Sequence, residues 1–517
     1  MKMTDSIDKN ARMYPNDAAF VEIRPVTEVR KEISWAQFNE RINRLASALI
    51  NKATGRGDKV FLLGRNSINW LVAYFAVMKT GAWVIPLNYR FTDGDIEFCA
   101  RVADPVAFIL DEEFTERVSG IRPRLPTIRN HNYICLGNVR PEGMDNVETL
   151  IENAPTAPPK VVLSDEDECA LYFTSGTTGA PKPLLITHKN LACAAITEAT
   201  NHYIEHSDTL LMIPPFYHLA IGHLLGCVLA GGQIILLTEK INPRYIFETI
   251  SNEHVSIIFL LVPWTLDIIE ALDKGELKKE DYDFKRWRLM YMGAQPIPPD
   301  LVRRWKEYFP ETQYDTTYGL SEAGGPGIIR LGIGNEKKIG AIGKPGLLWD
   351  ARIVNNEGKD VPVGEIGEII VKGYGVMKEY YKNPELTAET VRNGWLYTGD
   401  LARMDEEGFI YLVDRKKDLI ICGGENIHPV EIEEVIQRHP KVHDVAVIGT
   451  PDPRLSEIVT AVISPKPGEV LTEEEIKLFC EQNMPRYKRP RRIIFDEVPR
   501  SSTGKIEKPN LREKYAR

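Results

Sequence analysis

Two periodicities of apolar residues alternate along the chain. Residues Trp35–Ile50 and Asn69–Lys79 carry apolar side chains at helical spacing, which predicts two helices. The short apolar runs Lys59–Leu63 and Val84–Pro86 are typical of buried strands. Further runs of this kind follow at Val106–Leu110, Ala170–Phe173, Gln233–Leu237 and Ile257–Val262. Helices that alternate with short buried strands predict an α/β fold with mostly parallel sheets covered by helices.

The most apolar long window, Leu219–Leu237, has about the length of a membrane span. It contains His223 and four glycines, two of them adjacent at Gly231-Gly232. These residues favour a buried helix, a turn and a strand over a membrane helix, so we expect no transmembrane segment. The start of the chain also lacks the run of about 7–15 apolar residues of a secretory signal, so we expect no export.

The carboxyl end of the chain shows a compact pattern of its own. A run of charges at Asp414–Asp418 follows the apolar strand Phe409–Val413. The pattern after it predicts, in order, helix Pro429–Arg438, strands Asp444–Ile448 and Ile458–Ile463, helix Glu473–Asn483 and strand Arg492–Phe495. Thr472 and Glu475 have the spacing of a capping box at the second of these helices. We therefore expect a small, separate α+β domain at this end.

Composition narrows the classes of function. The chain has 517 residues, of which 43% are apolar and 26% charged, an ordinary composition for a globular protein of several domains. Its 64 basic and 73 acidic residues give a net charge of −9, which disfavours non-specific nucleic-acid binding. The seven cysteines are widely spaced without a C-x-x-C pair, so neither a disulfide framework nor a zinc site is indicated. A reducing cytoplasm fits this cysteine usage best.

A loop rich in glycine and hydroxyl groups follows the apolar run Ala170–Phe173. It consists, in order, of Thr174, Ser175, Gly176, Thr177, Thr178, Gly179, Ala180, Pro181 and Lys182. Glycine backbone can turn its N–H groups toward phosphate oxygens, the hydroxyls add donors, and the lysine adds positive charge. The prolines on either side of Lys182, Pro181 and Pro183, exclude the nucleotide motif G-x-x-x-x-G-K-[ST]. The loop therefore predicts a phosphate clamp of another type.

This loop closely resembles the phosphate-binding signature of the adenylate-forming superfamily, which includes acyl- and aryl-CoA synthetases, luciferases and peptide-synthetase adenylation domains. Four more motifs occur in that family's order: Tyr318-Gly319-Leu320-Ser321-Glu322, Tyr397-Thr398-Gly399-Asp400, Asp414–Asp418 leading into Gly423-Gly424-Glu425-Asn426, and Ser502-Thr503-Gly504-Lys505-Ile506. The resemblance covers essentially the whole chain. It implies a large multi-sheet amino-terminal domain, residues 1–416, that binds ATP and the acid. A hinge joins it to a small, mobile α+β carboxy-terminal domain, residues 417–517.

The resemblance also assigns an ATP site to particular residues. Asp400 and Arg415 match the family's ribose contacts, and a carboxylate suits two hydroxyl donors. Glu322 matches the magnesium ligand, and oxygen ligands suit a hard cation that is shared with phosphates. The implied contacts to adenine and the α-phosphate are Gly293, Ala294, Gln295, Tyr318, Gly319 and Ser321.

Three residues are implied to act in catalysis. Lys505 matches the lysine that bridges the substrate carboxylate and the α-phosphate, and His218 matches a position beside the carboxylate and the thiol entrance. Lys417 occupies the family's pivot position between the domains. Gly423 and Gly424 resemble the loop that lines the pantetheine tunnel, where paired glycines let a thin chain pass close to the backbone.

The chain departs from the family at two positions. Many relatives have glycine three residues after the histidine, where this chain has Ile221, and this leaves the geometry of the loop around His218 open. Relatives usually carry glycine after the loop lysine, where this chain has Pro183. Because proline has no N–H, one donor is lost and the loop is expected to be stiffer.

These motifs predict an ATP-dependent, AMP-forming carboxylic acid–CoA ligase that uses Mg²⁺ and coenzyme A. The acid and ATP would give an acyl-adenylate and pyrophosphate, and CoA would then displace AMP. One alternative is an enzyme that passes the acyl group to a carrier protein. A luciferase-type oxygenase would share every motif. A catalytically dead nucleotide sensor is disfavoured because Lys505 and Glu322 are both present.

The acid itself cannot be read from the sequence. The pocket walls implied by the resemblance are His218, Val262, Trp264, Met292, Gly293, Tyr318 and Gly319. The bulk of Trp264 would shorten the pocket, which favours an aromatic, alicyclic or short-to-medium acyl carboxylate. The expected partners are therefore a carboxylic acid, ATP and CoA, without nucleic acid, and a homodimer is left open.

Overall fold

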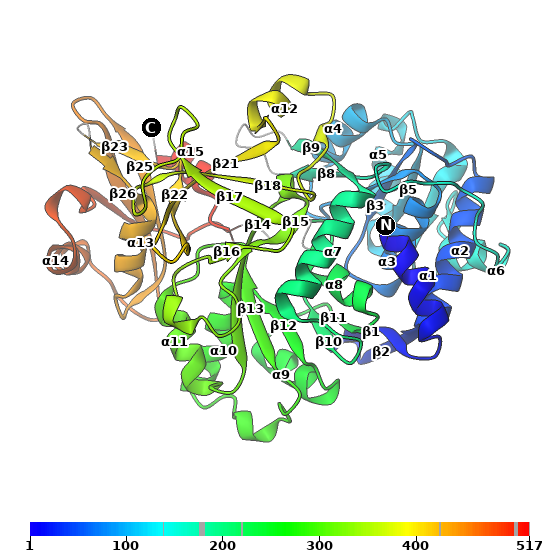
Figure 1. Cartoon of the computed structure of the whole chain (residues 1–517), viewed down its shortest axis with the longest axis horizontal. Coiled ribbons are helices and arrows are strands. Elements are labelled where there is room, and N and C mark those ends of the chain that lie inside the picture. The colour runs from blue at the N-terminus through cyan, green and yellow to red at the C-terminus, as the bar shows by residue number, and fades with distance from the viewer. Residues whose placement is uncertain (138, 175–180, 219–220, 423–424, 501–504, 516–517) are drawn as a thin grey trace.

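The computed structural model describes residues 1–137, 139–174, 181–218, 221–422, 425–500 and 505–515. Three sheets build a large amino-terminal domain, and a fourth sheet lies in a small carboxy-terminal domain (Figure 1). The predicted mixed α/β class with a large and a small domain is confirmed. Among the described residues, no helix has both the length and the apolar character needed to cross a membrane.

The eight-stranded sheet is parallel over most of its width. In spatial order its strands are β19 (Glu379–Tyr380), β9 (Lys182–Thr187), β8 (Glu168–Thr174), β4 (Trp83–Leu87), β3 (Lys59–Leu63), β5 (Ala107–Leu110), β6 (Tyr133–Cys135) and β7 (Asp145–Asn146). Only β9 and β19 run antiparallel to their neighbours. Helix α3 (Ile68–Lys79) packs on this sheet, and its almost continuous apolar sequence is buried all round.

The nine-stranded sheet carries the other half of the large domain. Its strands, in spatial order, are β16 (Lys344–Pro345), β15 (Gly325–Arg330), β14 (Gln313–Leu320), β13 (Leu289–Gly293), β12 (Ile257–Leu260), β10 (Thr209–Met212), β11 (Gln233–Leu237), β1 (Ala18–Arg24) and β2 (Val29–Ser34). Strands β14, β13, β12, β10, β11 and β1 are parallel, so their carboxyl ends share one edge. This edge holds the candidate residues Gly293, Tyr318 and Gly319, and Ala294 and Ser321 directly follow its strands.

Helices fill the space between the sheets and cover their outer faces. In Figure 1, α7 (His188–His202) and α8 (Gly222–Ala230) lie between the two large sheets, and one apolar core joins α8 to both of them. Helices α9 (Pro243–Asn252), α10 (Val262–Asp273) and α11 (Pro299–Tyr308) share a second core with the far face of the nine-stranded sheet. The remaining helices of this domain are α1 (Met3–Met13), α2 (Trp35–Asn51), α4 (Asp93–Ala103), α5 (Thr115–Ile121), α6 (Val147–Glu152) and α12 (Pro384–Thr390).

A third sheet of the large domain is antiparallel throughout, which differs from the mostly parallel sheets that we predicted. Its strands are β17 (Trp349–Val354), β18 (Gly367–Gly373), β21 (Trp395–Met404) and β20 (Val391–Arg392), with β22 (Ile410–Arg415) paired to β21. Because every neighbouring pair is antiparallel, no pair needs the crossover connection that parallel strands require.

The small domain packs helices on a sheet that is antiparallel except at one edge. Its strands are β24 (Glu425–Ile427), β23 (Ile420–Cys422), β26 (Ser456–Pro465) and β25 (Val442–Asp452), with β27 (Arg492–Phe495) parallel to β26. The helices are α13 (Pro429–Gln437), α14 (Glu473–Asn483) and α15 (Lys508–Tyr515). The capping box predicted for α14 is present, since the Thr472 side chain accepts a hydrogen bond from Glu475 N–H.

Most predicted elements are confirmed, and four match to the residue: β3, β11, α14 and β27. The apolar window at 219–237 contains α8 and β11, as expected for a buried helix and strand. The predicted strand Ile257–Val262 is too long, because β12 ends at Leu260 and Val262 begins α10, where Pro263 suits the first turn. All seven cysteines are buried and unpaired.

Candidate active site

Asp400 is the centre of a contact between two sheets. The antiparallel pair β21–β22 places Asp400 opposite Arg415, whose Nε donates to Asp400 Oδ1 at 2.8 Å. The hydroxyl of Tyr318, at the end of β14, donates to Asp400 Oδ2 at 2.7 Å. Asp400 is only 5% exposed, whereas the Arg415 side chain is 46% exposed. Burial, reinforced by the carboxylate, raises the pKa of Tyr318. Three predicted nucleotide contacts therefore meet in one hydrogen-bonded cluster.

Glu322 lies just beyond β14 in the 3₁₀ turn Ser321–Ala323, which also contains the predicted contact Ser321. Its Oε1 accepts a hydrogen bond of 2.8 Å from the Tyr380 hydroxyl, and the Lys182 ammonium lies 5.6 Å from the centroid of the Tyr380 ring. Tyr380 therefore links the loop lysine to the acidic residue. Glu322 offers a carboxylate as a possible metal ligand. In the described part of the chain, no group of three or more His, Cys, Asp or Glu side chains could hold a metal ion. A single carboxylate fits a Mg²⁺ ion whose other ligands are phosphates and water.

Lys182 and Thr174 close the base of the glycine-rich loop. They face each other in the β8–β9 hairpin, and the Thr174 hydroxyl donates to the Lys182 carbonyl at 3.5 Å. Pro183 pairs with Phe173 in this hairpin, and its carbonyl accepts from Tyr381 N–H on the other side. The proline is thus accommodated in the strand. The predicted contacts Ser175, Gly176, Thr177, Thr178 and Gly179 lie outside the described residues.

The glycines of this edge stand where backbone approaches closely. A Cβ atom at Gly319 would lie 2.4 Å from the carbonyl oxygen of Gly325, and one at Gly293 would lie 2.6 Å from that of Thr317. Ala294, directly after Gly293, has a φ of +71°, which is unusual for a residue with a side chain. Gly293 and Ala294 lie at the end of β13, and Gly319 lies next to Tyr318 in β14.

Gln295 contacts the small domain. Its side-chain oxygen lies 3.4 Å from Nη1 of Arg500, and the same guanidinium makes a bidentate pair with Asp444 at 2.6 and 2.7 Å. The sequence prediction included Gln295 but missed Arg500, because nothing in the sequence pattern points to this pairing. Tyr380 was missed for the same reason, since it stands far along the chain from both Lys182 and Glu322.

Lys505 lies among the acidic and basic residues of the cluster. Part of Lys505 is exposed to solvent, but the protein atoms around its ammonium group partly desolvate it. This desolvation lowers the pKa of Lys505. Arg415 lowers the pKa further, whereas Asp400 and Glu322 act in the opposite direction. Burial, together with the Lys505 charge, lowers the pKa of His218 to about 3, so this imidazole is neutral at neutral pH. Lys505, His218, Asp400 and Glu322 are therefore brought together.

Lys417 follows β22 in an exposed turn, and the turn lies between the two domains. Partial burial lowers the pKa of Lys417, and the positive charge of Arg415 lowers it further to a smaller extent. The predicted tunnel residues Gly423 and Gly424 lie outside the described residues. In Figure 1, β23, which leads into them, lies at the outer edge of the small domain, away from β13 and β14. The structure thus brings Lys505 to Asp400 and leaves β23 remote from it.

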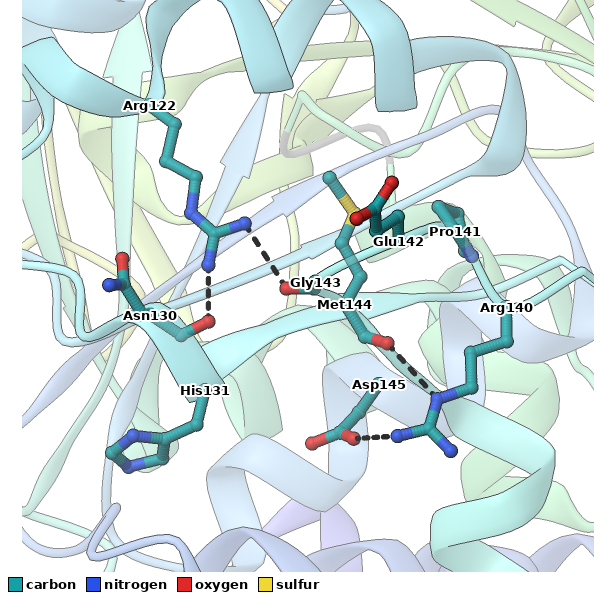
Figure 2. A pocket seen from close by; sticks show the side chains of 9 residues that line it. All are labelled: Arg122, Asn130, His131, Arg140, Pro141, Glu142, Gly143, Met144 and Asp145. Atoms are coloured by element: carbon teal, nitrogen blue, oxygen red, sulfur yellow. Dashed lines mark hydrogen bonds and ion pairs between the residues drawn. The ribbon is translucent and has the colours of Figure 1, made fainter.

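A hollow elsewhere on the large domain belongs to a different region. It lies near β6 and β7, at the edge of the eight-stranded sheet, and Figure 2 shows its lining: Arg122, Asn130, His131, Arg140, Pro141, Glu142, Gly143, Met144 and Asp145. Arg122 donates to the Gly143 carbonyl at 3.1 Å, and Arg140 to Asp145 at 3.3 Å. Both guanidinium groups are engaged within the hollow, and none of the predicted site residues lines it.

Comparison with known proteins identifies a family on two segments of the chain. Residues 7–381 match the family model of the AMP-binding enzyme, and residues 431–505 match that of the AMP-binding enzyme C-terminal domain. Together the two matches include the β14 edge, the glycine-rich loop and Lys505.

Individual relatives match over nearly their full length. A feruloyl-CoA synthase of Amycolatopsis sp is 31% identical, with 98% of each chain covered. The crystal structure of the anthranilate CoA ligase AuaEII in complex with anthranoyl-AMP has a TM-score of 0.89 and 26% identity, covering 99% of this chain and 97% of that one. ATP-bound MatB from Rhodopseudomonas palustris has a TM-score of 0.87 and 27% identity, covering 100% and 99%.

Proposed function

The chain belongs to the AMP-binding enzyme family, and on that premise we propose that it is an ATP-dependent, AMP-forming carboxylic acid–CoA ligase. The acid's oxygen attacks the α-phosphorus of ATP, and the bond to pyrophosphate breaks. The thiol of CoA then attacks the acyl carbon, its proton is lost, and AMP leaves with the oxygen. The observation that carries the proposal is the meeting of Lys505 with Asp400, Arg415 and Glu322 at the β14 edge.

In the first step, the protein has to reduce repulsion between a carboxylate and a polyphosphate. The Lys505 ammonium supplies positive charge between the two, and His218 stays neutral beside the carboxylate. Asp400 and Arg415 hold the ribose, with Tyr318 against the base. Glu322 would hold Mg²⁺, which supplies additional positive charge to the phosphates when bound.

The loop from Thr174 to Lys182 cradles the phosphates. The two ends of this loop, Thr174 and Lys182, are held together by the β8–β9 hairpin. The ring of Tyr380 orients the Lys182 side chain. Ser321 contacts the α-phosphate, while Gly293, Ala294, Gln295 and Gly319 shape the adenine site. Support for these roles comes from the short distances between the residues and from the family's use of ATP.

In the second step, in which the CoA thiol attacks the acyl carbon, a different part of the small domain has to lie beside that carbon. Residues 417–517 turn about Lys417 against residues 1–416, which exchanges Lys505 for the Gly423–Gly424 loop. The separation of β23 from β13 and β14 in Figure 1 supports a turn of this kind, because β23 directly precedes the two glycines in the chain.

The acid is an aromatic, alicyclic or short-to-medium acyl carboxylate. Relatives named for ferulate and anthranilate support an aromatic acid. The half-buried Trp264, which packs against the cores on both faces of the nine-stranded sheet, supports a short pocket. The enzyme acts in the cytoplasm on a free acid, ATP and CoA, and a homodimer is compatible with these roles.

The test is product analysis with the purified chain. ATP, Mg²⁺ and CoA are supplied with a panel of carboxylic acids, and AMP, pyrophosphate and thioester are measured together. We expect the three products in equal amounts with at least one acid. AMP and pyrophosphate without thioester, or transfer only to an added carrier protein, would contradict a CoA ligase. The Lys505→Ala variant serves as the background control.

A further inference from the structure

A cluster of buried polar side chains lies between α7, α8 and the nine-stranded sheet. Glu198 and His202 come from α7, His223 from the first turn of α8, Tyr291 from β13 and Asp315 from β14. Glu198 Oε2 lies 3.1 Å from His223 Nδ1 and accepts from the Tyr291 hydroxyl at 3.2 Å. The two nitrogens of His202 lie 3.5 Å from Glu198 and 3.8 Å from Asp315. Buried charges and polar groups at this density are costly to maintain, which suggests a use for them.

The two histidines of this cluster differ in one respect. Both ring nitrogens of His202 are closed off from solvent. His223 turns Nδ1 toward Glu198 and Tyr291, but its Nε2 has no hydrogen-bond partner among the described residues and is not closed off. The His223 side chain retains 6% exposure, whereas that of Glu198 has none. His223 therefore presents one unengaged ring nitrogen to an accessible space.

Strand register places this space next to the candidate acid pocket. Tyr291 pairs with Phe259 on one side, and His223 stacks on the Phe259 ring with 3.9 Å between centroids. Gly293 lies two residues beyond Tyr291 on the same face, toward the carboxyl edge where His218 and Lys505 lie. A Cβ atom at Gly293 would lie 2.6 Å from the Thr317 carbonyl oxygen and 3.6 Å from Phe259, so glycine lets β14 approach this point beside the Phe259 ring with no side chain in between. An acid whose carboxylate is at Lys505 can extend over Gly293 toward His223.

The protonation of the cluster follows from its contacts. Burial alone would raise the pKa of Glu198, but the adjacent His223 and His202 lower it to about 2, so the carboxylate is ionised. Tyr291 keeps its proton because burial raises its pKa. Nδ1 of His223 must then carry hydrogen to face the carboxylate, which leaves Nε2 as an acceptor in the neutral ring or a donor in the charged one. A hydroxyl group can donate or accept, and it therefore pairs with Nε2 in either state.

We infer that His223 is a specificity-determining residue, and that its Nε2 hydrogen-bonds a hydroxyl group at the end of the acid distant from the carboxylate. The inference rests on the proposed function and narrows it to hydroxyl-bearing acids. Glu198 and Tyr291 are positioning residues, since they hold the ring through Nδ1.

The test compares pairs of acids that differ only by a distal hydroxyl. For each pair, kcat/KM for pyrophosphate release is measured with the wild type, His223→Leu and His202→Leu. His202 is the matched control, because it shares Glu198 as a partner but has no open nitrogen. We expect the best hydroxylated acid to be preferred by about tenfold in the wild type, as for one well-placed hydrogen bond. That preference disappears in His223→Leu and persists in His202→Leu.

Two results would overturn the inference: no wild-type preference for any hydroxylated acid, or an equal loss of preference in both variants. His223→Gln is measured in parallel in case the leucine variants fold poorly, and it is expected to retain part of the preference because its amide can hydrogen-bond. Failure of the proposed function looks different, because then no acid of either kind yields AMP and thioester. If the hydroxylated and the unhydroxylated acid of each pair are activated at equal rates, the proposed ligase activity stands and only the role of His223 is rejected.

Discussion

At the scale of single residues, the candidate site depends on one carboxylate with several partners. Both oxygens of Asp400 are engaged, by Arg415 on the neighbouring strand and by Tyr318 from a different sheet. A buried carboxylate is stable in this position because charge-assisted hydrogen bonds replace its water. For the proposed contact to the ribose, these bonds would fix the orientation of the carboxylate, so we expect loss of one bond to weaken nucleotide binding.

Tyr318→Phe removes the hydroxyl that donates to Asp400 and keeps the ring. The lost bond to a buried carboxylate is worth about 1.5–3 kcal/mol, so we expect KM for ATP to rise roughly tenfold or more, with a smaller change in kcat. Steady-state kinetics at varied ATP measures this. Tyr411→Phe, which loses a 3.3 Å bond to Asp405 on an exposed turn, is the control and should behave as the wild type. Equal KM values in both variants would contradict the role of Tyr318.

At the scale of elements, local sequence signals set most helices and strands but not the contacts between them. The capping residues of α14 and the apolar runs of β3 and β11 are local, and the predictions there match. The antiparallel third sheet was not anticipated, because its strands are half-buried and lack one clear period. The link from Glu322 to Tyr380 depends on β9 and β19 pairing at the sheet edge, which no local pattern encodes. The motifs therefore point to candidate residues, including the three that meet at Asp400, but not to partners outside the motifs such as Tyr380 and Arg500.

Gly319 marks a close approach between β14 and β15. A Cβ atom there would meet the Gly325 carbonyl and the Pro326 backbone, neither of which can move without shifting the strand. We expect Gly319→Ala to lower the free energy of unfolding by about 1–3 kcal/mol and to impair adenylate formation. Gly120→Ala, where a Cβ atom has nothing within 4 Å, is the control. Equal thermal unfolding temperatures for the two variants would count against this packing.

Asp414 connects the strand β22 of the large domain to the helix α13 of the small domain. One of its oxygens accepts from Val430 N–H at 3.1 Å, and burial raises the pKa of Asp414 to about 6. The folded state therefore holds this proton more tightly than the unfolded state. The resulting stabilisation is complete below pH 3.8 and is lost as pH rises through 6, by up to about 3 kcal/mol.

Asp414→Asn keeps an acceptor but removes this titration. The unfolding temperature of the variant, relative to that of the wild type, should therefore increase between pH 4 and pH 7. Thermal unfolding followed across that range measures the difference. Profiles that stay parallel over the whole range would show that Asp414 does not carry a raised pKa.

At the scale of the whole molecule, two chemical steps share one acyl carbon. The structure places Lys505 near Asp400, Arg415 and Glu322, while β23 lies at the outer edge of the small domain. The turn around Lys417 is exposed. The backbone N–H of Lys417 itself donates no hydrogen bond to another backbone group among the described residues. A rotation there would break few contacts within the turn itself.

Lys417→Pro restricts φ at this turn to about −65°. We expect it to spare adenylate formation in the arrangement described and to slow transfer to CoA, because the rotation needs a different backbone angle. Single-turnover measurement of each step separates them, and Lys416→Ala controls for loss of charge. Equal slowing of both steps, or of neither, would contradict a pivot at Lys417.

The most direct test of the central claim is the behaviour of Lys505→Ala in the two half-reactions. The claim is that this lysine stabilises the charge of adenylate formation and leaves the site before thioester formation. We expect a loss of about 10²-fold or more with ATP and acid, as for removal of one electrostatic group from a transition state. Chemically made acyl-adenylate and CoA should react at nearly the wild-type rate. If the variant is equally impaired in both assays, Lys505 does not act where the structure places it.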